Sequence, residues 1–341
     1  MHKQLLIGKS FDEILAFVKE IGASNFRAKQ LYNWLYQKSV NSIEEMSDLP
    51  ADFKEKIKEK FTISNFCIKD KQISKDGTIK YLFSLYDGNT TESVLMRFDN
   101  RANLTACIST QAGCPMECSF CATGKLGLKR NLSAEEIIQQ IHMIQADTKL
   151  KVTNIVFMGQ GEPLLNLDNV LNAIKVFNND YQVGARRMTL STCGIIPQIN
   201  KLADLHFQST LAISLHAPNS KIRKEIMPVE RKYPIEELIK TLKNYTIKTG
   251  RRVTIEYTLI KDVNDSVENG KELALLISEL KCNVNLIIYN PNEFCEYKKP
   301  SKTDIMKFKY ILEASGKKVT VRLERGSDID AACGQLSGKA K

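Results

Sequence analysis

The sequence predicts an α/β fold: a partial barrel of six strand–helix units, preceded by a small helical domain and extended by a β-hairpin. The main observation is that six short β-rich runs alternate with helix-like stretches, at residues 104–109, 154–158, 187–191, 211–215, 253–260 and 283–289. Strands that alternate with helices form parallel sheets, which curl into full or partial barrels. The expected division is a helical domain over 1–66, a hairpin region over 67–103, the barrel over 104–336 and a flexible tail over 337–341.

The segment before the barrel shows two further patterns. Within the helix-like stretch 10–60, Leu31, Trp34 and Leu35 share one helical face, which is the spacing of a packed helix. The runs 80–85 and 93–98 are rich in β-forming residues, and the turn Asp87-Gly88-Asn89 lies between them. This combination predicts a hairpin.

The first helix of the barrel has a recognisable start. Ser133 followed three residues later by Glu136 is a capping box, which marks a helix N-terminus. In barrels of this kind the chemistry lies at the C-terminal ends of the strands. The loops that follow the six β-rich runs are therefore the places to look for functional residues.

Composition limits the class of protein. Of the 341 residues, 43% are hydrophobic and 26% are charged, which excludes wholesale disorder, collagen and coiled coil. No apolar run approaches the roughly 20 residues needed to span a bilayer, and the first residues lack a signal-peptide core. We therefore expect a cytoplasmic protein with reduced thiols and no membrane partner. The net charge of +10 is spread along the chain and fits either a solvated surface or a face that meets phosphate backbones.

Three of the nine cysteines form a compact motif after the first barrel strand. Cys114, Cys118 and Cys121 have the spacing C-x-x-x-C-x-x-C. A complete four-iron cluster normally takes four cysteines, so three leave one iron open to a ligand. Structural zinc needs a fourth protein ligand, and no Cys or His follows at close spacing. The motif favours an iron–sulfur cluster over zinc or three structural cysteines.

Polar residues follow the other strands. A glycine-rich turn, Gly159 to Pro163, comes after the second strand, and glycine lets the backbone approach a ligand closely. Ser191 ends the third strand, Ser214 to His216 end the fourth, and Asn290 follows the sixth. Each alone is equally typical of a cap or a satisfied core polar group. Together they indicate a polar cofactor at the C-terminal edge of the barrel.

The cysteine spacing after the first strand resembles the signature of radical S-adenosylmethionine (SAM) enzymes. In that superfamily the three cysteines hold one [4Fe–4S] cluster, whose open iron binds the amino and carboxylate groups of SAM. One electron from the cluster then cleaves SAM to methionine and a 5′-deoxyadenosyl radical. The resemblance implies the same for Cys114, Cys118 and Cys121, and it makes the barrel a partial (β/α)6 radical SAM barrel.

Further motifs narrow the resemblance to the bacterial dual-specificity adenine-C2 RNA methyltransferases. These motifs lie at residues 112–114, 120–124, 158–166, 214–219 and 328–336, and the resemblance runs from about Arg27 to Leu336. It implies methylation of 23S ribosomal RNA and of transfer RNA at adenosine 37, giving 2-methyladenosine with two SAM per turnover. It also implies an electron donor such as flavodoxin or ferredoxin, and a monomer. The helical domain and the basic surface are the expected RNA-holding parts.

The same resemblance assigns roles to single residues. Cys333 carries the methyl group, and Cys107 releases the product by forming a transient disulfide with Cys333. Glu92 is the base for the C2 proton. The expected SAM contacts are Gly161, Glu162, Ser191, Ser214, Leu215, His216 and Asn290. The remaining cysteines, Cys67, Cys193, Cys282 and Cys295, are expected to be small buried hydrophobes.

The chemistry of adenine fits this scheme, and alternatives stay open. C2 lies between two ring nitrogens and is a poor nucleophile, whereas a carbon radical can add there. The sister family that methylates adenine C8 and confers antibiotic resistance shares the cluster motif, but it usually has Ala where this chain has Pro163. A non-catalytic iron–sulfur or zinc protein that binds RNA is a remoter alternative. The alternative for Glu92 is an exposed glutamate in a solvated hairpin, since the segment to Cys107 looks longer than usual for the family.

Overall fold

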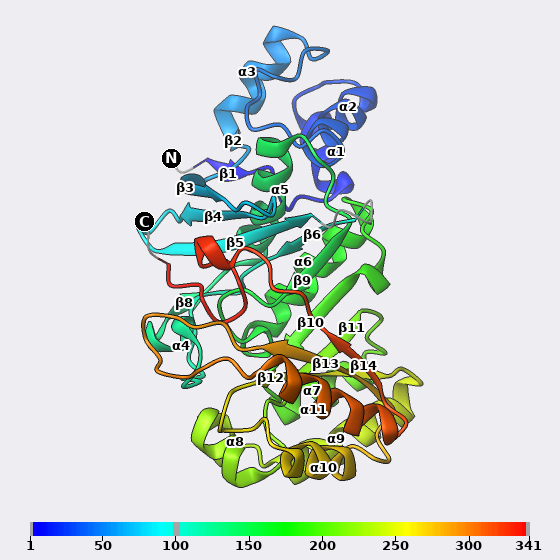
Figure 1. The fold of residues 1–341 in the computed structure, drawn as a ribbon. Helices are drawn as coiled ribbons and strands as arrows, with labels where there is room; N and C mark the ends of the chain where they lie inside the picture. The colour runs from blue at the N-terminus through cyan, green and yellow to red at the C-terminus, as the bar shows by residue number, and fades with distance from the viewer. Residues whose placement is uncertain (1–2, 98–102, 339–341) are drawn as a thin grey trace.

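The computed structural model describes residues 3–97 and 103–338 and is built around one ten-stranded sheet (Figure 1). The strand order is β14-β13-β12-β11-β10-β9-β6-β5-β4-β3. From β6 to β14 neighbouring strands are parallel, and from β3 to β6 they are antiparallel. The parallel strands are β6 (Leu104–Cys107), β9 (Asn154–Phe157), β10 (Met188–Thr192), β11 (Thr210–Ser214), β12 (Val253–Leu259), β13 (Cys282–Ile288) and β14 (Lys318–Val321).

All six predicted barrel strands are present, which confirms the α/β prediction. A seventh parallel strand, β14, was not predicted; it has four residues, including Lys318 and Thr320, and lies at the edge of the sheet. The helices between the strands are α5 (Ala134–Thr148), α6 (Leu167–Asn179), α7 (Ile196–Asp204), α8 (Ser220–Ile226), α9 (Ile235–Thr249), α10 (Val267–Leu276) and α11 (Lys302–Ala314). Short 3-10 turns lie at Pro163–Asn166, Ala185–Arg187, Pro228–Arg231 and Ser327–Ile329.

The predicted hairpin is formed by β4 (Ile79–Ser84) and β5 (Thr90–Arg97), joined through the turn at Asp87. A further strand, β3 (Cys67–Ile73), pairs with β4, and β5 pairs antiparallel with β6. The hairpin therefore continues the barrel sheet. Phe98, where the second predicted strand ends, and residues 339–341 of the expected tail lie outside the described residues. Gly338 is described, and its amide donates a hydrogen bond of 2.7 Å to Glu92.

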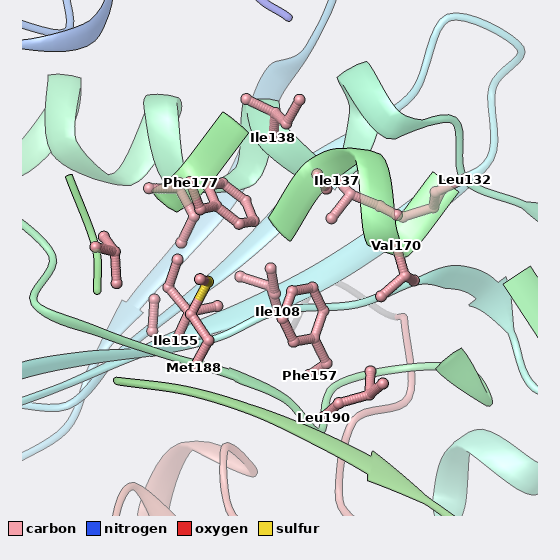
Figure 2. Close-up of a cluster of buried hydrophobic side chains, with 14 of the residues drawn as sticks. Ile108, Leu132, Ile137, Ile138, Ile155, Phe157, Val170, Phe177, Met188 and Leu190 are labelled. Atoms are coloured by element: carbon pink, nitrogen blue, oxygen red, sulfur yellow. The ribbon is translucent and has the colours of Figure 1, made fainter. Parts of the chain in front are cut away.

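The parallel strands pack one face against the helices. Ile155, Phe157 and Leu190 alternate with inward-facing residues and are almost fully buried together with Ile137 and Val170 of α5 and α6 (Figure 2). Burying an aliphatic or aromatic side chain of this size contributes about 1.5–3 kcal/mol. The apolar core of the barrel therefore lies between the sheet and its outer helices.

The N-terminal domain consists of α1 (Phe11–Glu20), α2 (Asn25–Tyr36) and α3 (Ala51–Lys60), at one end of the molecule beyond α5 (Figure 1). Two short strands, β1 (Gln4–Leu5) and β2 (Phe61–Thr62), pair in parallel beside these helices. Leu31, Trp34 and Leu35 are buried as predicted. In the described part of the chain, no helix has the length and apolar character required to span a bilayer.

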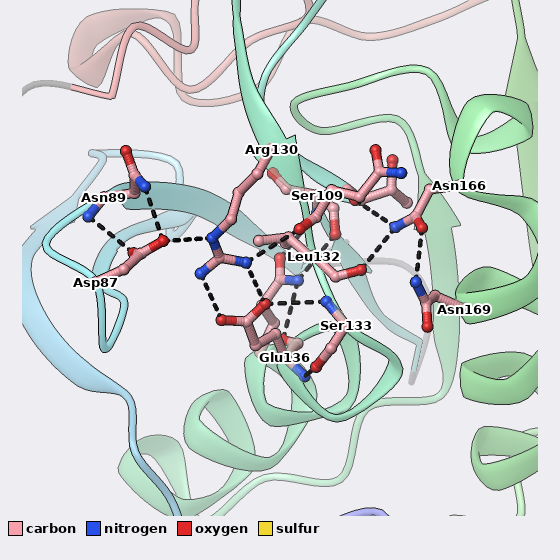
Figure 3. Close-up of polar contacts among 12 residues, drawn as sticks. Asp87, Asn89, Ser109, Arg130, Leu132, Ser133, Glu136, Asn166 and Asn169 are labelled. Atoms are coloured by element: carbon pink, nitrogen blue, oxygen red, sulfur yellow. Dashed lines mark hydrogen bonds and ion pairs between the residues drawn. The ribbon is translucent and has the colours of Figure 1, made fainter.

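A polar network fixes the hairpin β7 (Gln111–Gly113) and β8 (Leu128–Asn131), which carries the cysteine loop (Figure 3). Arg130 of β8 forms a bidentate pair with Glu136 of α5, at 2.6 and 2.8 Å, and also contacts Asp87 of the β4–β5 turn. Glu136 in turn closes the predicted capping box with Ser133. Asn166 donates to the carbonyl oxygens of Thr110 and Leu132, at 2.9 and 2.7 Å. The base of the cysteine loop is thus tied to three other parts of the fold.

Candidate active site

The three motif cysteines lie in the loop between β7 and α4 (Ala122–Lys125). The amide of Cys114 donates to the carbonyl of Gly127 at 3.1 Å, and the amide of Cys121 donates to that of Cys118 at 3.2 Å. Gly113 has a φ of +78°, and a Cβ there would come within 1.9 Å of the Gly127 oxygen. The loop therefore requires glycine where it begins, because any side chain would push the hairpin apart.

Segments that are distant in the sequence form hydrogen bonds with this loop. The amide of Ala122 donates to the Gly334 carbonyl at 2.8 Å, and the Thr123 hydroxyl donates to the Leu336 carbonyl at 2.7 Å. The Cys295 thiol contacts the Ser119 carbonyl at 2.9 Å. The segment that carries Cys333 thus packs directly against the cysteine loop.

One cavity of about 160 Å³ brings together most of the predicted site residues. Its wall includes the three motif cysteines, Cys333 and the predicted SAM contacts Gly161, Glu162, Ser191, Ser214 and His216. The hydroxyl oxygens of Ser191 and Ser214 are 3.3 Å apart. These residues come from the ends of β9, β10 and β11 and from the loops behind them, as the barrel geometry predicts.

Two of the predicted SAM contacts lie elsewhere. Leu215, the residue after β11, is fully buried in the apolar core and is not on the cavity wall that Ser214 lines. Asn290 lines the neighbouring cavity instead, where its side chain donates to the Cys333 carbonyl at 3.3 Å. Its own oxygen, Oδ1, is buried without a hydrogen-bond partner in the structure.

Glu162 anchors the glycine-rich turn. Its carboxylate accepts hydrogen bonds from the amides of Leu164, at 3.0 Å, and Cys193, at 2.8 Å, and burial raises the pKa of this carboxyl. Gly161 has a φ of +103°, and a Cβ there would lie 2.6 Å from the Gln111 side chain. The turn thus holds its backbone against the base of the cysteine loop, which leaves room for a ligand on the other side.

His216 is neutral in this site. Its Nδ1 accepts a hydrogen bond from the Thr258 amide at 2.9 Å, and its ring meets Phe120 edge-on at 5.1 Å. Burial lowers the pKa of His216 to about 3. The imidazole therefore serves as an uncharged wall of the cavity at neutral pH.

Cys107 and Cys333 line a second cavity of about 110 Å³ next to the first. Cys107, at the end of β6, is buried, while Cys333 is exposed, and both are free thiols. Burial, and then the nearby Cys333, raise the pKa of Cys107 to about 12, whereas the guanidinium of Arg322 lowers it. The structure therefore brings the two predicted reactive cysteines into one space beside the motif cysteines.

Glu92 lies in neither of these cavities. It sits on β5 with no solvent exposure, so the alternative of an exposed hairpin glutamate is wrong. Its Oε2 accepts hydrogen bonds from the backbone amide of Gly338, at 2.7 Å, and from the side-chain Nε2 of Gln160, at 3.3 Å, and the Lys80 ammonium lies 3.6 Å from Oε1. Burial raises the pKa of Glu92, and these contacts oppose the rise.

Two residues on the wall of the first cavity were missed by the sequence analysis. Cys193, expected to be only a small buried hydrophobe, is buried but also lines this cavity, and its sulfur is 3.2 Å from that of Met116. Glu256 of β12 lines the same cavity and is almost fully buried. A glutamate inside an apolar β-rich run was the available signal, because buried carboxylates are rare unless paired.

The donor set fits an iron–sulfur cluster. Burial raises the pKa of Cys114 to about 12 and those of Cys118 and Cys121 as well, so three thiolates require a bound cation to stay together here. The three motif cysteines line one cavity. They would supply three of the four thiolates that a complete four-iron cluster normally takes, which leaves one iron open to a ligand.

Two family models match the chain. The model of the radical SAM superfamily matches residues 108–274, and the ribosomal RNA large subunit methyltransferase N-terminal domain matches residues 5–63. Together with the partial barrel and its cysteine loop, these matches define a radical SAM enzyme, with a [4Fe–4S] cluster and SAM as cofactors.

Similarity to individual proteins shows which kind of radical SAM enzyme this is. The chain is 46% identical over 344 residues to the probable dual-specificity RNA methyltransferase RlmN of Staphylococcus aureus strain JH9, and the strain Newman protein gives the same identity. Each match covers 99% of this chain and 94% of the relative. The crystal structure of a radical SAM methyltransferase from Sphaerobacter thermophilus matches with a TM-score of 0.92 at 39% identity, over 98% of this chain and 100% of that one. The chain belongs to the RlmN family of dual-specificity RNA methyltransferases.

Proposed function

We propose that the protein methylates adenine C2 in 23S ribosomal RNA and in transfer RNA at adenosine 37, through a methyl group carried on Cys333. The observation that carries the proposal is the shared cavity of Cys107 and Cys333 beside the cysteine motif, in a chain whose relatives are named dual-specificity RNA methyltransferases. The exposed thiol of Cys333 suits a carrier, because it is open to both a methyl donor and a large substrate.

The cofactors supply a methyl group and a hydrogen-abstracting radical when they are bound at the motif cysteines. Around them, Gly161, Glu162, Ser191, Ser214 and His216 hold and orient SAM in the first cavity, and Asn290 bounds it from the second. Leu215 would contact SAM through its backbone, since its side chain is buried in the core. Cys333 lines this same cavity, which supports its proposed role as the methyl carrier.

Cys107 acts in the release of the product. Once a methylene group joins the Cys333 sulfur to adenine, the Cys107 sulfur attacks the Cys333 sulfur and the carbon–sulfur bond breaks. The electron pair stays on the carbon, which takes up a proton, and the two cysteines leave as a disulfide that must be reduced before the next turnover. Because only the thiolate attacks, the guanidinium of Arg322, which lowers the pKa of Cys107, assists this step.

Glu92 is proposed as the base for the C2 proton. Its Oε1 is buried and accepts no hydrogen bond in the structure, so it has a lone pair available for a proton. The rise in the pKa of Glu92 caused by burial brings a carboxyl closer to the working range of a general base. Reaching the substrate requires a movement of Glu92 or of the Gly338 segment that now contacts it.

RNA is the substrate class that the family supports, and the chain has a net charge of +10 to meet phosphates. We assign RNA holding to residues 1–66, with 67–103 as the hairpin region, 104–336 as the barrel and 337–341 as the tail. We also propose that the protein is a monomer and that it receives electrons from a small carrier such as flavodoxin or ferredoxin.

Cysteine variants test the assignment. Cys107→Ala should trap a covalent protein–RNA adduct, because water is a poor substitute for a thiolate in the release step. Cys333→Ala and the double variant should form neither adduct nor 2-methyladenosine, as the carrier acts before the release step. Cys67→Ala is the matched control, since Cys67 lies exposed on β3 outside the described site. Mass spectrometry of nuclease-treated protein and RNA provides the measurement; normal turnover by Cys107→Ala would contradict the proposal.

A further inference from the structure

The largest of the three neighbouring cavities, about 610 Å³, has no role in the scheme so far. It lies on the inner face of the barrel sheet, where Thr189, Thr210, Thr254 and Thr320 line it. The interior of a closed barrel is usually filled by layers of bulky Val, Ile and Leu side chains. Here short polar side chains take those positions and leave a space, which we call the threonine chamber.

The strand register links the chamber to the cysteines. Cys107 of β6 pairs with Val156 of β9, Val156 pairs with Thr189 of β10, and Thr189 pairs with Thr210 of β11. These four residues form one row across the sheet and face the same side, because side chains at paired positions of adjacent strands do so. The chamber wall is therefore continuous with Cys107.

A second row of paired residues links the threonine chamber to the first cavity, that of the motif cysteines and the proposed SAM contacts, which we call the SAM cavity. Ser214 of β11 pairs with Glu256 of β12, Glu256 with Asn285 of β13, and Asn285 with Thr320 of β14. Glu256 is on the wall of both the SAM cavity and the threonine chamber. It therefore stands at the boundary between the proposed methyl donor and an unassigned space.

The volume of the threonine chamber and the lining residues that it shares with the other two cavities make it suitable for the target nucleotide. Met158 lines all three cavities, so they adjoin one another at this residue, and Cys333 lines the two smaller ones. The cavity of Cys107 and Cys333 holds only about 110 Å³, and the cavity of the motif cysteines is already assigned to SAM. The chamber, at about 610 Å³, lies within the range of roughly 300–1,000 Å³ that is typical of ligand pockets, so it has room for a flipped-out nucleotide. Arg322 lines both the chamber and the cavity of Cys107 and Cys333.

Glu256 has an unused hydrogen-bonding atom at this junction. Its side chain is 3% exposed, and Oε1 accepts a hydrogen bond from Asn285 at 2.9 Å. Oε2 is buried, accepts no hydrogen bond from the described residues and forms only a long ion pair with Arg322, at 3.7 Å. A buried carboxylate oxygen without a donor is costly, so a donor supplied by a ligand would be strongly favoured.

We propose that the threonine chamber receives the target nucleotide and that Glu256 is a specificity-determining residue that accepts a hydrogen bond from the 6-amino group of adenine. A carboxylate only accepts hydrogen bonds, and adenine presents a donor at this position where guanine and inosine present an acceptor. Enzymes that act on a flipped base commonly read its pairing edge in this way. The inference rests on the proposed function and names the group that selects adenine.

The first experiment compares two RNA stem-loops that carry either adenosine or purine riboside, which lacks the 6-amino group, at the target position. The wild-type protein should prefer adenosine by about tenfold or more in kcat/KM, the range of a hydrogen bond to a charged group. Glu256→Gln should reduce this preference severalfold, and Glu256→Met should abolish it. Glu230→Gln, a change in another buried Glu–Arg pair, is the matched control and should keep the preference.

The second experiment fills the chamber. Thr254→Phe should raise the KM for RNA or abolish methylation, with bound iron and SAM binding showing that the variant is folded, whereas Ile247→Phe on the exposed face of α9 should behave like the wild type. No methylation of the adenosine stem-loop by the wild type would overturn the proposed function itself. Methylation with unchanged base preference in both Glu256 variants, with or without weaker SAM binding, would overturn the role of Glu256. Normal RNA methylation by Thr254→Phe would overturn the chamber.

Discussion

Arg223 of α8 is a fully buried charge, and its replacement by methionine tests how the proposed SAM site is held. The guanidinium is fully buried and pairs with Glu230 at 2.5 Å. It also donates hydrogen bonds to the carbonyls of Cys193, at 2.6 Å, and Leu215, at 3.3 Å. One side chain thus fixes the backbone just after β10 and just after β11, where the proposed SAM contacts lie.

The expected loss of unfolding free energy follows from the carboxylate that Arg223→Met leaves without its partner. Arg223→Met keeps most of the side-chain volume but leaves the Glu230 carboxylate buried without its cation, which costs about 3–5 kcal/mol of unfolding free energy. Removing both charges in Arg223→Met/Glu230→Met should recover about 1–3 kcal/mol. Recovery should stay incomplete, because the carbonyls of Cys193 and Leu215 still lack their donor.

The assay is anaerobic urea unfolding of the cluster-loaded protein, followed by circular dichroism, together with SAM affinity measured on the folded variants. We expect weaker SAM binding in both variants, since the two loops lose their common anchor. Lys243→Met is the control. Lys243 of α9 forms an exposed ion pair with Glu279, and its loss should leave stability unchanged. A loss below about 1 kcal/mol in the single variant, or a double variant no more stable than the single, would refute the reasoning.

Four further outcomes are expected. Alanine at any one motif cysteine should abolish SAM cleavage and reduce bound iron, whereas Cys282→Ala should retain both; SAM cleavage by a triple variant would refute this. Gly113→Ala should also lose bound iron, because its Cβ would meet the Gly127 oxygen, while Gly250→Ala, with open space around it, should retain iron. Burial lowers the pKa of His142 to about 4, so between pH 6.5 and 4 the unfolded chain binds the extra proton and stability falls by up to about 1.4 kcal/mol per pH unit. His142→Gln should flatten this dependence in unfolding experiments, and an unchanged slope would contradict it. RNA affinity should fall with salt in filter-binding titrations, and a flat response would exclude a phosphate-contacting surface.

The barrel strands could be predicted because their outer residues form a continuous apolar face. Ile155, Phe157 and Leu190 are almost completely buried against helices, and this burial is what a β-rich run in the sequence reports. β3 and β14 escaped prediction for the opposite reason. Their residues alternate between exposed and half-buried positions or are largely exposed, so charged side chains such as Lys71 and Lys318 interrupt the apolar signal.

The C-terminal ends of the parallel strands meet at one edge of the sheet, and this rule predicted the position of most candidate site residues. That rule and the family resemblance together placed Glu162, Ser191 and His216 near the motif cysteines. It failed for the side chain of Leu215, since a rule about strand ends does not say which face a residue occupies. The position of Glu92 behind the Gly338 segment depends on how the C-terminal residues return to β5, which no local pattern encodes.

The threonine chamber marks the limit of sequence reasoning for a physical reason. Thr189, Thr254 and Asn285 look like ordinary polar alternation in half-buried strands, and such alternation normally means solvent on the polar side. Curling the sheet turns that same side into the interior, so the polar face encloses a cavity that adjoins the cavity of Cys107 and Cys333. The outer face then has to supply the packing energy, and it does so with residues such as Ile213 and Ile255 that are fully buried. A barrel stabilised from outside can leave its interior open for a substrate, and only the register of the strands reveals which polar residues line it.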